Sequence, residues 1–236
     1  MTPGSCRPAG SVLHAPATDE ALSFYANVMG WSILSGEVTH GVLGVDDNPT
    51  VLVTRRPGIA AWHLAFTASD HRPLSEPFDL LADRRLDTML GVVSQYADPF
   101  GAVFSLCQSS DAVRTQPPEW LEHKSVDPPR AGRVYAAAFH WTLVWTSSGF
   151  PNVAIDGDPR GGFVAVAGQG RWLPYFQVAD TAAVCSSVVA LGGSTITSPT
   201  EVGRGRRYAW CRDPWGADFK LLDALQDNWP LPPLID

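Results

Sequence analysis

The sequence of 236 residues predicts an α+β protein that contains two copies of one structural plan. Three aromatic landmarks recur after 110 residues (135 − 25 = 110), and they are the pairs Tyr25 and Tyr135, Trp31 and Trp141, and Trp62 and Trp172. Asp98 in DPFGAVFSL and Asp213 in DPWGADFKL are 115 residues apart, so the second copy carries an insertion of five residues (115 − 110 = 5). Landmarks that keep this phase indicate an internal repeat.

The repeat predicts a first domain over residues 1–115 and a second domain over residues 116–236. The segment QPPEW, which opens the second copy, contains paired prolines of the kind found in exposed connections. We therefore place the boundary between the domains at this segment.

In the first copy, a strand is expected over residues 10–17, followed by a helix that carries Leu22, Tyr25 and Val28 on one face. Thr18 or Asp19 is expected to cap this helix, and Gly30 is expected to end it. Short strands follow over 31–36, 41–46 and 50–55. The order then restarts with a strand over 61–68, a helix over 75–85 and further strands that end in AVFSLC at 102–107.

The second copy repeats this order. Strands are expected over 119–125 and 173–179, and helices over 129–139 and 182–191, the latter capped by Asp180 or Thr181 and ended by Gly192. The plan of one strand, one helix and further strands thus occurs four times. We predict four βαβββ modules whose curled mixed sheets form concave pockets, with the helices on one side of the sheets.

Composition narrows the classes of function. The net charge of −7 argues against nucleic acid and anionic membranes as partners, because both bind basic surfaces. The four cysteines are scattered, and the first residues lack a signal-peptide pattern, so we expect a cytoplasmic protein, a monomer or a homodimer. Nine tryptophans favour a pocket for a small aromatic or hydrophobic organic ligand, although most tryptophans in such a chain pack into cores.

Five segments carry a family resemblance, and they are ALSFYANVMGW (21–31), WHLAFTASD (62–70), DPFGAVFSL (98–106), WLPYFQVAD (172–180) and DPWGADFKLL (213–222). They resemble the glyoxalase/bleomycin-resistance/dioxygenase (vicinal oxygen chelate) superfamily, in its two-domain actinobacterial type. The resemblance implies tandem domains of this fold. It leaves the reaction open, because the fold hosts isomerases, dioxygenases, thiol transferases, metal-free cyclases and drug-binding proteins.

The resemblance also implies where metal ligands would stand. The equivalent positions are Gly10, His63 and Ser105 in the first copy, and Trp120, Leu173 and Lys220 in the second copy. Only His63 matches the superfamily's pattern, and a protonated lysine repels a metal cation. We therefore predict that the protein uses no metal and no other cofactor.

Strand alternation places other side chains on the same concave faces as these positions. We predict catalytic roles for His14, His63, Ser105 and Glu122. Residues predicted to bind the substrate are Thr67, Trp120, Lys124, Trp172, Tyr175, Gln177 and Lys220. The two histidines could exchange protons with a substrate, or they could form a hydrogen-bonded structural pair; the acidic and basic residues of the second copy could act on a substrate or form an ion-pair network.

Three functions follow in order of preference. The first is a metal-independent lyase, cyclase or isomerase that performs acid–base chemistry on an aromatic or polyketide-like intermediate of antibiotic biosynthesis. The second is a non-catalytic protein that sequesters a drug, as bleomycin-resistance proteins do. The third is a metal-dependent glyoxalase or dioxygenase.

Overall fold

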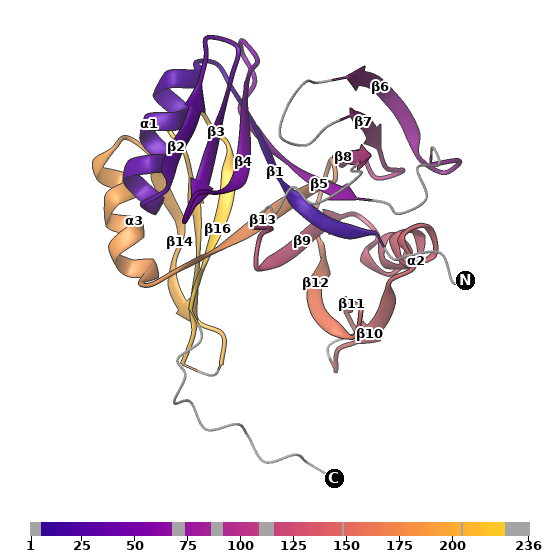
Figure 1. The fold of residues 1–236 in the computed structure, drawn as a ribbon. Coiled ribbons are helices and arrows are strands. Elements are labelled where there is room, and N and C mark those ends of the chain that lie inside the picture. Colours follow the sequence, from indigo (N-terminus) through magenta and orange to yellow (C-terminus); the bar gives the residue numbers. More distant parts are fainter. Residues whose placement is uncertain are drawn as a thin grey trace.

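The computed structural model describes residues 6–67, 74–85, 92–108, 116–147, 149–203 and 205–224, and of residues 82–85, 92 and 108 it describes the backbone alone. These residues form two mixed eight-stranded sheets and three α-helices, which is an α+β architecture (Figure 1). None of the helices in this part of the chain has the length and apolar character that a membrane crossing requires.

The first sheet is formed by the first copy alone, in the strand order β2-β3-β4-β1-β5-β8-β7-β6. Its strands are β1 (Arg7–Ala15), β2 (Ser32–Gly36), β3 (His40–Val45), β4 (Asn48–Arg55), β5 (Ala61–Thr67), β6 (Asp79–Arg85), β7 (Val92–Ala97) and β8 (Val103–Gln108). Strands β1 and β5 pair antiparallel at the centre, whereas β1 with β4 and β5 with β8 are parallel pairs.

The second sheet repeats this arrangement with the second copy, in the order β10-β11-β12-β9-β13-β16-β15-β14. Its strands are β9 (Trp120–Ser125), β10 (Thr142–Trp145), β11 (Pro151–Ile155), β12 (Asp158–Ala165), β13 (Arg171–Val178), β14 (Ser194–Glu201), β15 (Arg207–Arg212) and β16 (Asp218–Asp223). The equal strand order of the two sheets is the structural counterpart of the sequence repeat.

The helices are α1 (Thr18–Met29), α2 (Pro128–Phe139) and α3 (Thr181–Ala190). Helix α1 ends at Gly30, which has the left-handed φ of 71° that favours glycine. The capping prediction for α1 is wrong, because its N-cap is Ala17, which makes no side-chain bond, and Thr18 instead donates to the carbonyl of Val38. At α3 the carboxylate of Asp180 does cap the helix by accepting from two backbone amides.

The helix predicted over residues 75–85 is also wrong. Residues 79–85 form the edge strand β6, which pairs antiparallel with β7. Pro77 cannot donate a helical hydrogen bond, and Leu80 and Leu81 are exposed on the strand. Among the described residues a helix accompanies three of the four predicted modules, and the count of four βαβββ modules stays a prediction.

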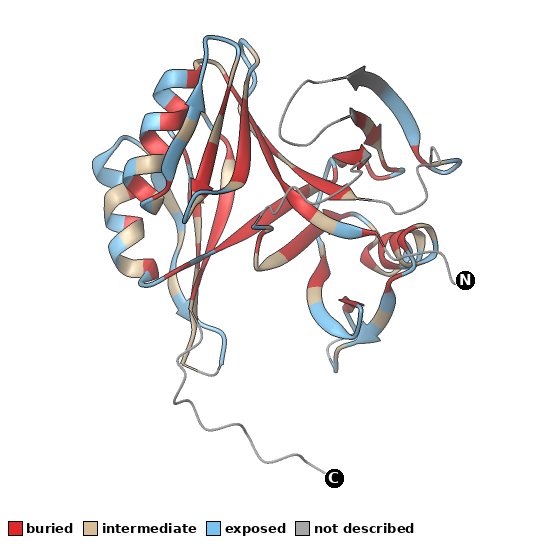
Figure 2. Cartoon of the chain, viewed as in Figure 1, coloured by how far each residue is buried: buried red, intermediate tan, exposed pale blue. Residues whose placement is uncertain are grey.

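Two hydrophobic cores lie between the copies. The first joins Tyr25 and Trp31 near α1 to Phe176 and Phe219 of the second sheet. The second core joins buried side chains of β5 and β8 to those of α2 and β13, namely Phe66, Phe104, Tyr135, Phe139 and Trp172. Figure 1 shows α1 and α3 side by side, and Figure 2 shows buried residues along the central strands of both sheets. Each sheet therefore belongs to one copy, while these two cores are shared and a smaller cluster around Val12 and Ala65 lies within the first copy. The division into two domains stays a prediction.

The landmarks of the repeat meet in two buried hydrogen-bond chains that connect the copies. Trp62 Nε1 donates to the hydroxyl of Tyr25 over 3.2 Å, and this hydroxyl donates to Oδ2 of Asp213 over 3.0 Å. The equivalent chain runs from Trp172 through Tyr135 to Oδ2 of Asp98, over 3.0 and 3.1 Å.

The aspartates of both chains also organise the turns that precede the last strand of each sheet. Oδ1 of Asp98 accepts from the amides of Phe100 and Ala102, and Oδ1 of Asp213 accepts in the same way from Trp215 and Ala217. One carboxylate thus fixes a turn in its own copy and a tyrosine in the other copy, which explains why these residue types recur.

Candidate functional site

The face of the first sheet that was predicted to be concave carries a histidine pair. His14 Nε2 and His63 Nδ1 are 3.1 Å apart, so one ring donates a hydrogen bond to the other, and the rings cross at 82°. His14 Nδ1 also lies 2.6 Å from the hydroxyl of Thr54. Burial, and then the charge of Arg56, lower the pKa of His63 to about 4, so this ring is neutral at pH 7.

Two other residues predicted in the first copy lie on the same sheet. Ser105 is buried on β8 next to Ala65 of β5. Thr67 stands at the end of β5, where its hydroxyl donates to the carbonyl of Arg7 over 3.4 Å. The structure thus brings His14 and His63 into contact and places Thr67 four residues along the strand from His63.

The face of the second sheet that was predicted to be concave carries a buried ionic cluster, which we call the lysine cluster. It is formed by Glu122, Tyr175, Lys220 and Lys124. Lys220 Nζ donates to both carboxylate oxygens of Glu122, over 2.8 and 2.9 Å, and to the hydroxyl of Tyr175 over 2.9 Å. The same hydroxyl donates to Glu122 over 2.7 Å. Burial, and then the Glu122 carboxylate, raise the pKa of Tyr175, which stays protonated.

Of the remaining predicted residues, Trp172 and Gln177 lie apart from the lysine cluster and Trp120 adjoins it. Trp172 is a core residue whose indole donates to Tyr135, and it also borders the cavity where the two sheets meet. Gln177 is exposed and lines a separate hollow beside the prolines at 117–118. Trp120 is half-buried at the start of β9, opposite Tyr175. The catalytic and substrate-binding roles assigned to all these residues stay predictions.

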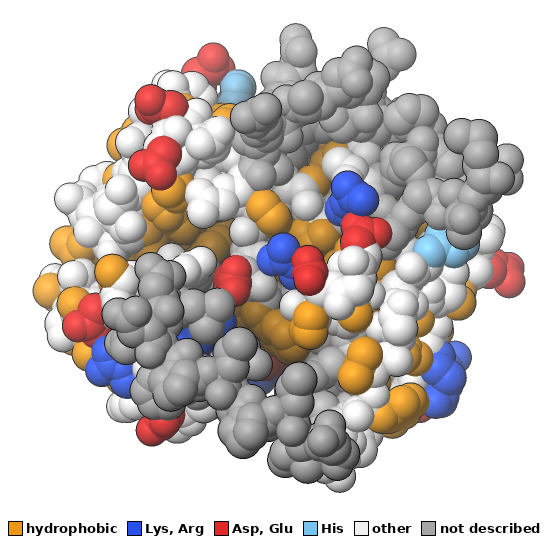
Figure 3. Space-filling model, turned by 60° about the horizontal axis from the view of Figure 1, so that its bottom comes forward, with side chains coloured by type: hydrophobic (Ala, Val, Ile, Leu, Met, Phe, Trp, Pro, Cys, Tyr) orange, Lys and Arg blue, Asp and Glu red, His pale blue; other side chains and the backbone are white. Residues whose placement is uncertain are grey.

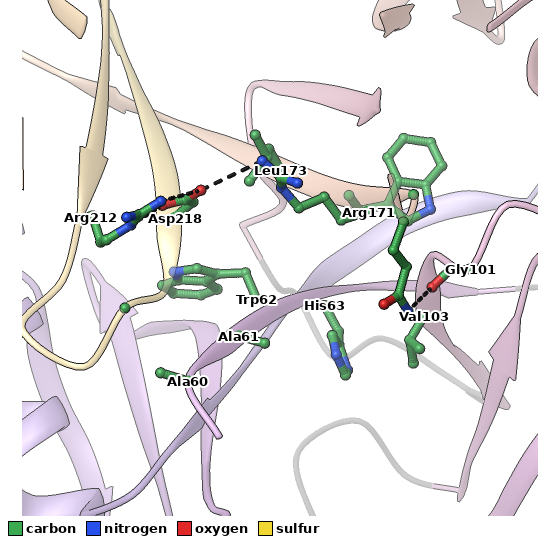
Figure 4. A pocket seen from close by; sticks show the side chains of 14 residues that line it. Ala60, Ala61, Trp62, His63, Gly101, Val103, Arg171, Leu173, Arg212 and Asp218 are labelled. Carbon is green, nitrogen blue, oxygen red and sulfur yellow. Dashed lines mark hydrogen bonds and ion pairs between the residues drawn. The ribbon is translucent and has the colours of Figure 1, made fainter. Parts of the chain in front are cut away.

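A cavity of about 400 Å³ lies where the two sheets meet, and we call it the central cavity. Its walls include Trp62 and His63 from β5, Arg171 and Leu173 from β13, Arg212 from β15 and Asp218 from β16 (Figure 4). Asp218 accepts from Arg212 over 2.6 Å and lies 3.7 Å from a guanidinium nitrogen of Arg171. Figure 3 shows a face of the molecule where basic and acidic side chains gather in a hollow among hydrophobic ones.

Sequence reasoning missed Trp62, Arg171 and Arg212 as cavity residues. A signal for Arg171 was present, because strand alternation back from Leu173 places its side chain on the same face. Trp62 had no such signal, since it alternates to the core face and reaches the cavity only because β5 and β13 meet there.

The side chains at the superfamily's ligand positions do not fit a divalent metal. Gly10, Trp120 and Leu173 offer no donor atom, and the ammonium of Lys220 is bound to Glu122. Within the described ranges, no group of three or more His, Cys, Asp or Glu side chains could hold a metal ion. The described part of the chain thus lacks the set of three or four protein ligands that a stable site requires.

A sequence model of the Glyoxalase/Bleomycin resistance protein/Dioxygenase superfamily matches residues 12–221. The chain belongs to this superfamily. No protein of curated function matches it. Among solved structures, it is similar to the 2,3-dioxygenase LapB from Pseudomonas sp. KL28, with a TM-score of 0.68 and 13% identity over 98% of this chain and 96% of that chain.

A second similar structure is an extradiol ring-cleaving dioxygenase from B. fuscum, with a TM-score of 0.68 and 14% identity over 97% of this chain and 75% of that chain. A variant of the homoprotocatechuate 2,3-dioxygenase from B. fuscum, solved in complex with HPCA, has a TM-score of 0.69 and 14% identity over the same shares. At such identities, these matches show the superfamily fold.

The comparisons correct the preferred functional prediction. These neighbours are ring-cleaving dioxygenases, which is the class that the sequence analysis ranked last, and they give no support to a lyase, cyclase or isomerase of antibiotic biosynthesis. The prediction of a metal-independent enzyme for polyketide-like intermediates is therefore wrong. It depended on missing ligands and composition, which identify neither a reaction nor a substrate.

Proposed function

We propose that this superfamily member binds a small aromatic molecule in the central cavity. The observation that carries the proposal is the composition of the cavity wall, where the ring of Trp62 and the side chain of Leu173 lie near the guanidinium groups of Arg171 and Arg212. Apolar walls with a few convergent polar groups are typical of sites for small organic ligands. The volume of about 400 Å³ is enough for a single-ring compound with a short side chain.

Similar structures support this class of ligand. The homoprotocatechuate dioxygenase solved with HPCA acts, by its name, on an aromatic compound that carries both a ring diol and an acid group. The guanidinium groups at the cavity suit such an acid group, since arginine forms paired hydrogen bonds with carboxylates.

Metal-dependent ring cleavage is a second candidate, and the shared fold with extradiol dioxygenases favours it. The side chains at the superfamily's metal-ligand positions argue against ring cleavage, because His63 is the one ordinary metal ligand among them. We therefore place ligand binding first and ring cleavage second.

Calorimetric titration with homoprotocatechuate and 4-methylcatechol tests the proposal. An Ala61→Phe variant, which fills the cavity from β5, is expected to weaken binding at least about tenfold, a change of about 1.4 kcal/mol. Ser198→Phe, at an exposed position of β14 outside the cavity wall, is the matched control and should bind as the unaltered protein does. If neither compound binds, the proposal is refuted.

The two candidates separate in one assay. The protein is supplied with Fe²⁺ or Mn²⁺ and homoprotocatechuate in air, and oxygen consumption and ring-cleavage absorbance are followed. We expect binding without oxygen consumption. Turnover that depends on the added metal would establish ring cleavage and overturn the order given above.

A further inference from the structure

The lysine cluster contains more positive than negative charge. Within the cluster, Lys124 and Lys220 share one carboxylate, that of Glu122. The neighbouring carboxylate of Asp218 is paired with Arg212 and Arg171. All three ammonium protons of Lys220 have acceptors, two on Glu122 and one on Tyr175. Lys124 Nζ lies 3.7 Å from Oε1 of Glu122, which is beyond hydrogen-bond distance. The excess charge of the cluster is therefore carried by Lys124.

Lys124 is held in surroundings that do not fully compensate its charge. The residue is only 8% exposed, and its Nζ lies 3.9 Å from the ring centre of Trp210. Burial is the largest cause that lowers the pKa of Lys124; Lys220 and Arg171 lower it further, while Glu122 and Asp218 oppose them. A buried ammonium with incomplete pairing is costly, and an anion brought by a ligand would lower that cost.

Two buried hydrogen-bond donors accompany Lys124. The indole Nε1 of Trp210 and the Nε of Arg171 have no hydrogen-bond partner among the described residues. Trp210 lies opposite Lys220 in the pairing of β15 with β16, and Arg171 lies opposite Lys124 in the pairing of β13 with β9. These donors thus belong to strand positions next to the lysine cluster.

The lysine cluster adjoins the central cavity. Arg171 and Leu173 line the cavity, and their cross-strand partners on β9 are Lys124 and Glu122. A ligand in the cavity can therefore direct one substituent along the concave face toward Lys124. The buried excess of one positive charge matches a singly charged group, and Arg171, which lies opposite Lys124 and has a buried Nε without a partner, can bind the same group.

We propose that Lys124, together with Arg171, binds the carboxylate of an aromatic acid, so that this site selects organic monoanions over neutral rings. The inference rests on the proposed function, since it assigns the ligand class of the same cavity. Lys220 occupies the position of the superfamily's metal-binding carboxylate and is hydrogen-bonded to Glu122. The ammonium of Lys124 is therefore available to bind the ligand.

The test compares homoprotocatechuate with 4-methylcatechol, which has the same ring diol and no carboxylate. Both are titrated by calorimetry into the full chain and into Lys124→Met, Lys124→Arg and the control Arg133→Met, whose side chain is exposed on α2. We expect the unaltered protein to prefer the acid about tenfold or more, as one charge-assisted hydrogen bond implies. Lys124→Met should remove this preference and leave the affinity for 4-methylcatechol unchanged, while Lys124→Arg and Arg133→Met should keep the preference.

A second readout is proton uptake. Binding of the carboxylate stabilises the ammonium form of Lys124, whose pKa burial lowers. In titrations at increasingly alkaline pH, the acid should therefore bind with growing uptake of protons as the unliganded ammonium begins to lose its proton, seen as heats that differ between buffers of different ionisation enthalpy. Equal affinity for the two compounds, or a preference that survives in Lys124→Met, would overturn this inference and leave the proposed function standing. Failure of both compounds to bind would overturn the two together.

Discussion

The two hydrogen-bond chains between the copies allow the stability of two equivalent variants to be predicted and compared. Tyr25→Phe and Tyr135→Phe remove hydroxyl groups at equivalent positions of the repeat. In the second chain, Oδ2 of Asp98 keeps a hydrogen bond of 2.6 Å from Nε2 of His123 after the hydroxyl is lost. In the first chain, Oδ2 of Asp213 has Tyr25 as its side-chain donor.

The number of buried polar groups that lose their hydrogen-bond partner sets the expected loss in the free energy of unfolding. Tyr135→Phe leaves one buried donor, the indole of Trp172, without a partner and should cost about 2 kcal/mol. Tyr25→Phe leaves both the indole of Trp62 and Oδ2 of Asp213 without partners and should cost about 4 kcal/mol.

Urea unfolding followed by tryptophan fluorescence and circular dichroism measures both costs. Because each hydrophobic core is shared between the copies, we expect the two signals to change in a single transition. The control is the double variant Tyr135→Phe, His123→Leu, because the equivalent of His123 in the first copy is Leu13 (123 − 110 = 13). It removes both side-chain donors from Oδ2 of Asp98, as Tyr25→Phe removes the side-chain donor from Oδ2 of Asp213. If Tyr135→Phe proves as costly as Tyr25→Phe, the reasoning from orphaned groups fails.

Three further predictions address single positions. The pKa of His63 is lowered to about 4, so between pH 6.5 and 4 the folded state binds fewer protons than the unfolded state does. The free energy of unfolding should therefore fall as the pH falls through this range. Urea unfolding of His63→Gln should show a loss that is smaller by about 3 kcal/mol. Gly170→Ala would place its Cβ 2.7 Å from the carbonyl oxygen of Phe100, so it should lower the free energy of unfolding by more than about 2 kcal/mol. Gly168→Ala, at a position with open space and a φ of +93°, should lower it by about 1 kcal/mol. Equal losses of stability would contradict the close contact at Gly170. Ala17→Ser should raise the stability of the protein by about 0.5–1 kcal/mol by supplying the missing cap of α1, and an unchanged thermal midpoint would count against that cap geometry.

Much of the fold could be predicted because its signals are local. Alternation along β9 and β13 placed Glu122, Lys124 and Tyr175 on one face, and the structure brings these side chains together. The segment at 75–85 failed because its composition suits a helix, while pairing with β7 decides its conformation. Propensity within the segment carries no information about that distant partner.

The site was less predictable than the fold. The sequence indicated charged residues on the second concave face, but not that Lys220 would use all three protons within the lysine cluster and leave the excess charge on Lys124. That outcome depends on distances of a few tenths of an ångström between strands distant in sequence. The central cavity likewise combines β5 with β13, which no pattern within one copy could indicate.

The sequence by itself determined the duplication, the order of most strands and helices, the faces of the central strands, and that His63 is the one ordinary metal ligand at the superfamily's positions. These properties follow from periodicity and side-chain chemistry. Only the tertiary structure decided that the hydrophobic cores form between the copies, that Tyr25 meets Asp213 and Tyr135 meets Asp98, and that a cavity lies beside Lys124. These features arise from contacts between segments that lie apart in the sequence, 188 residues for Tyr25 and Asp213 and 37 residues for Tyr135 and Asp98. They also depend on the desolvation that such contacts impose, and neither is encoded in any local stretch of the chain.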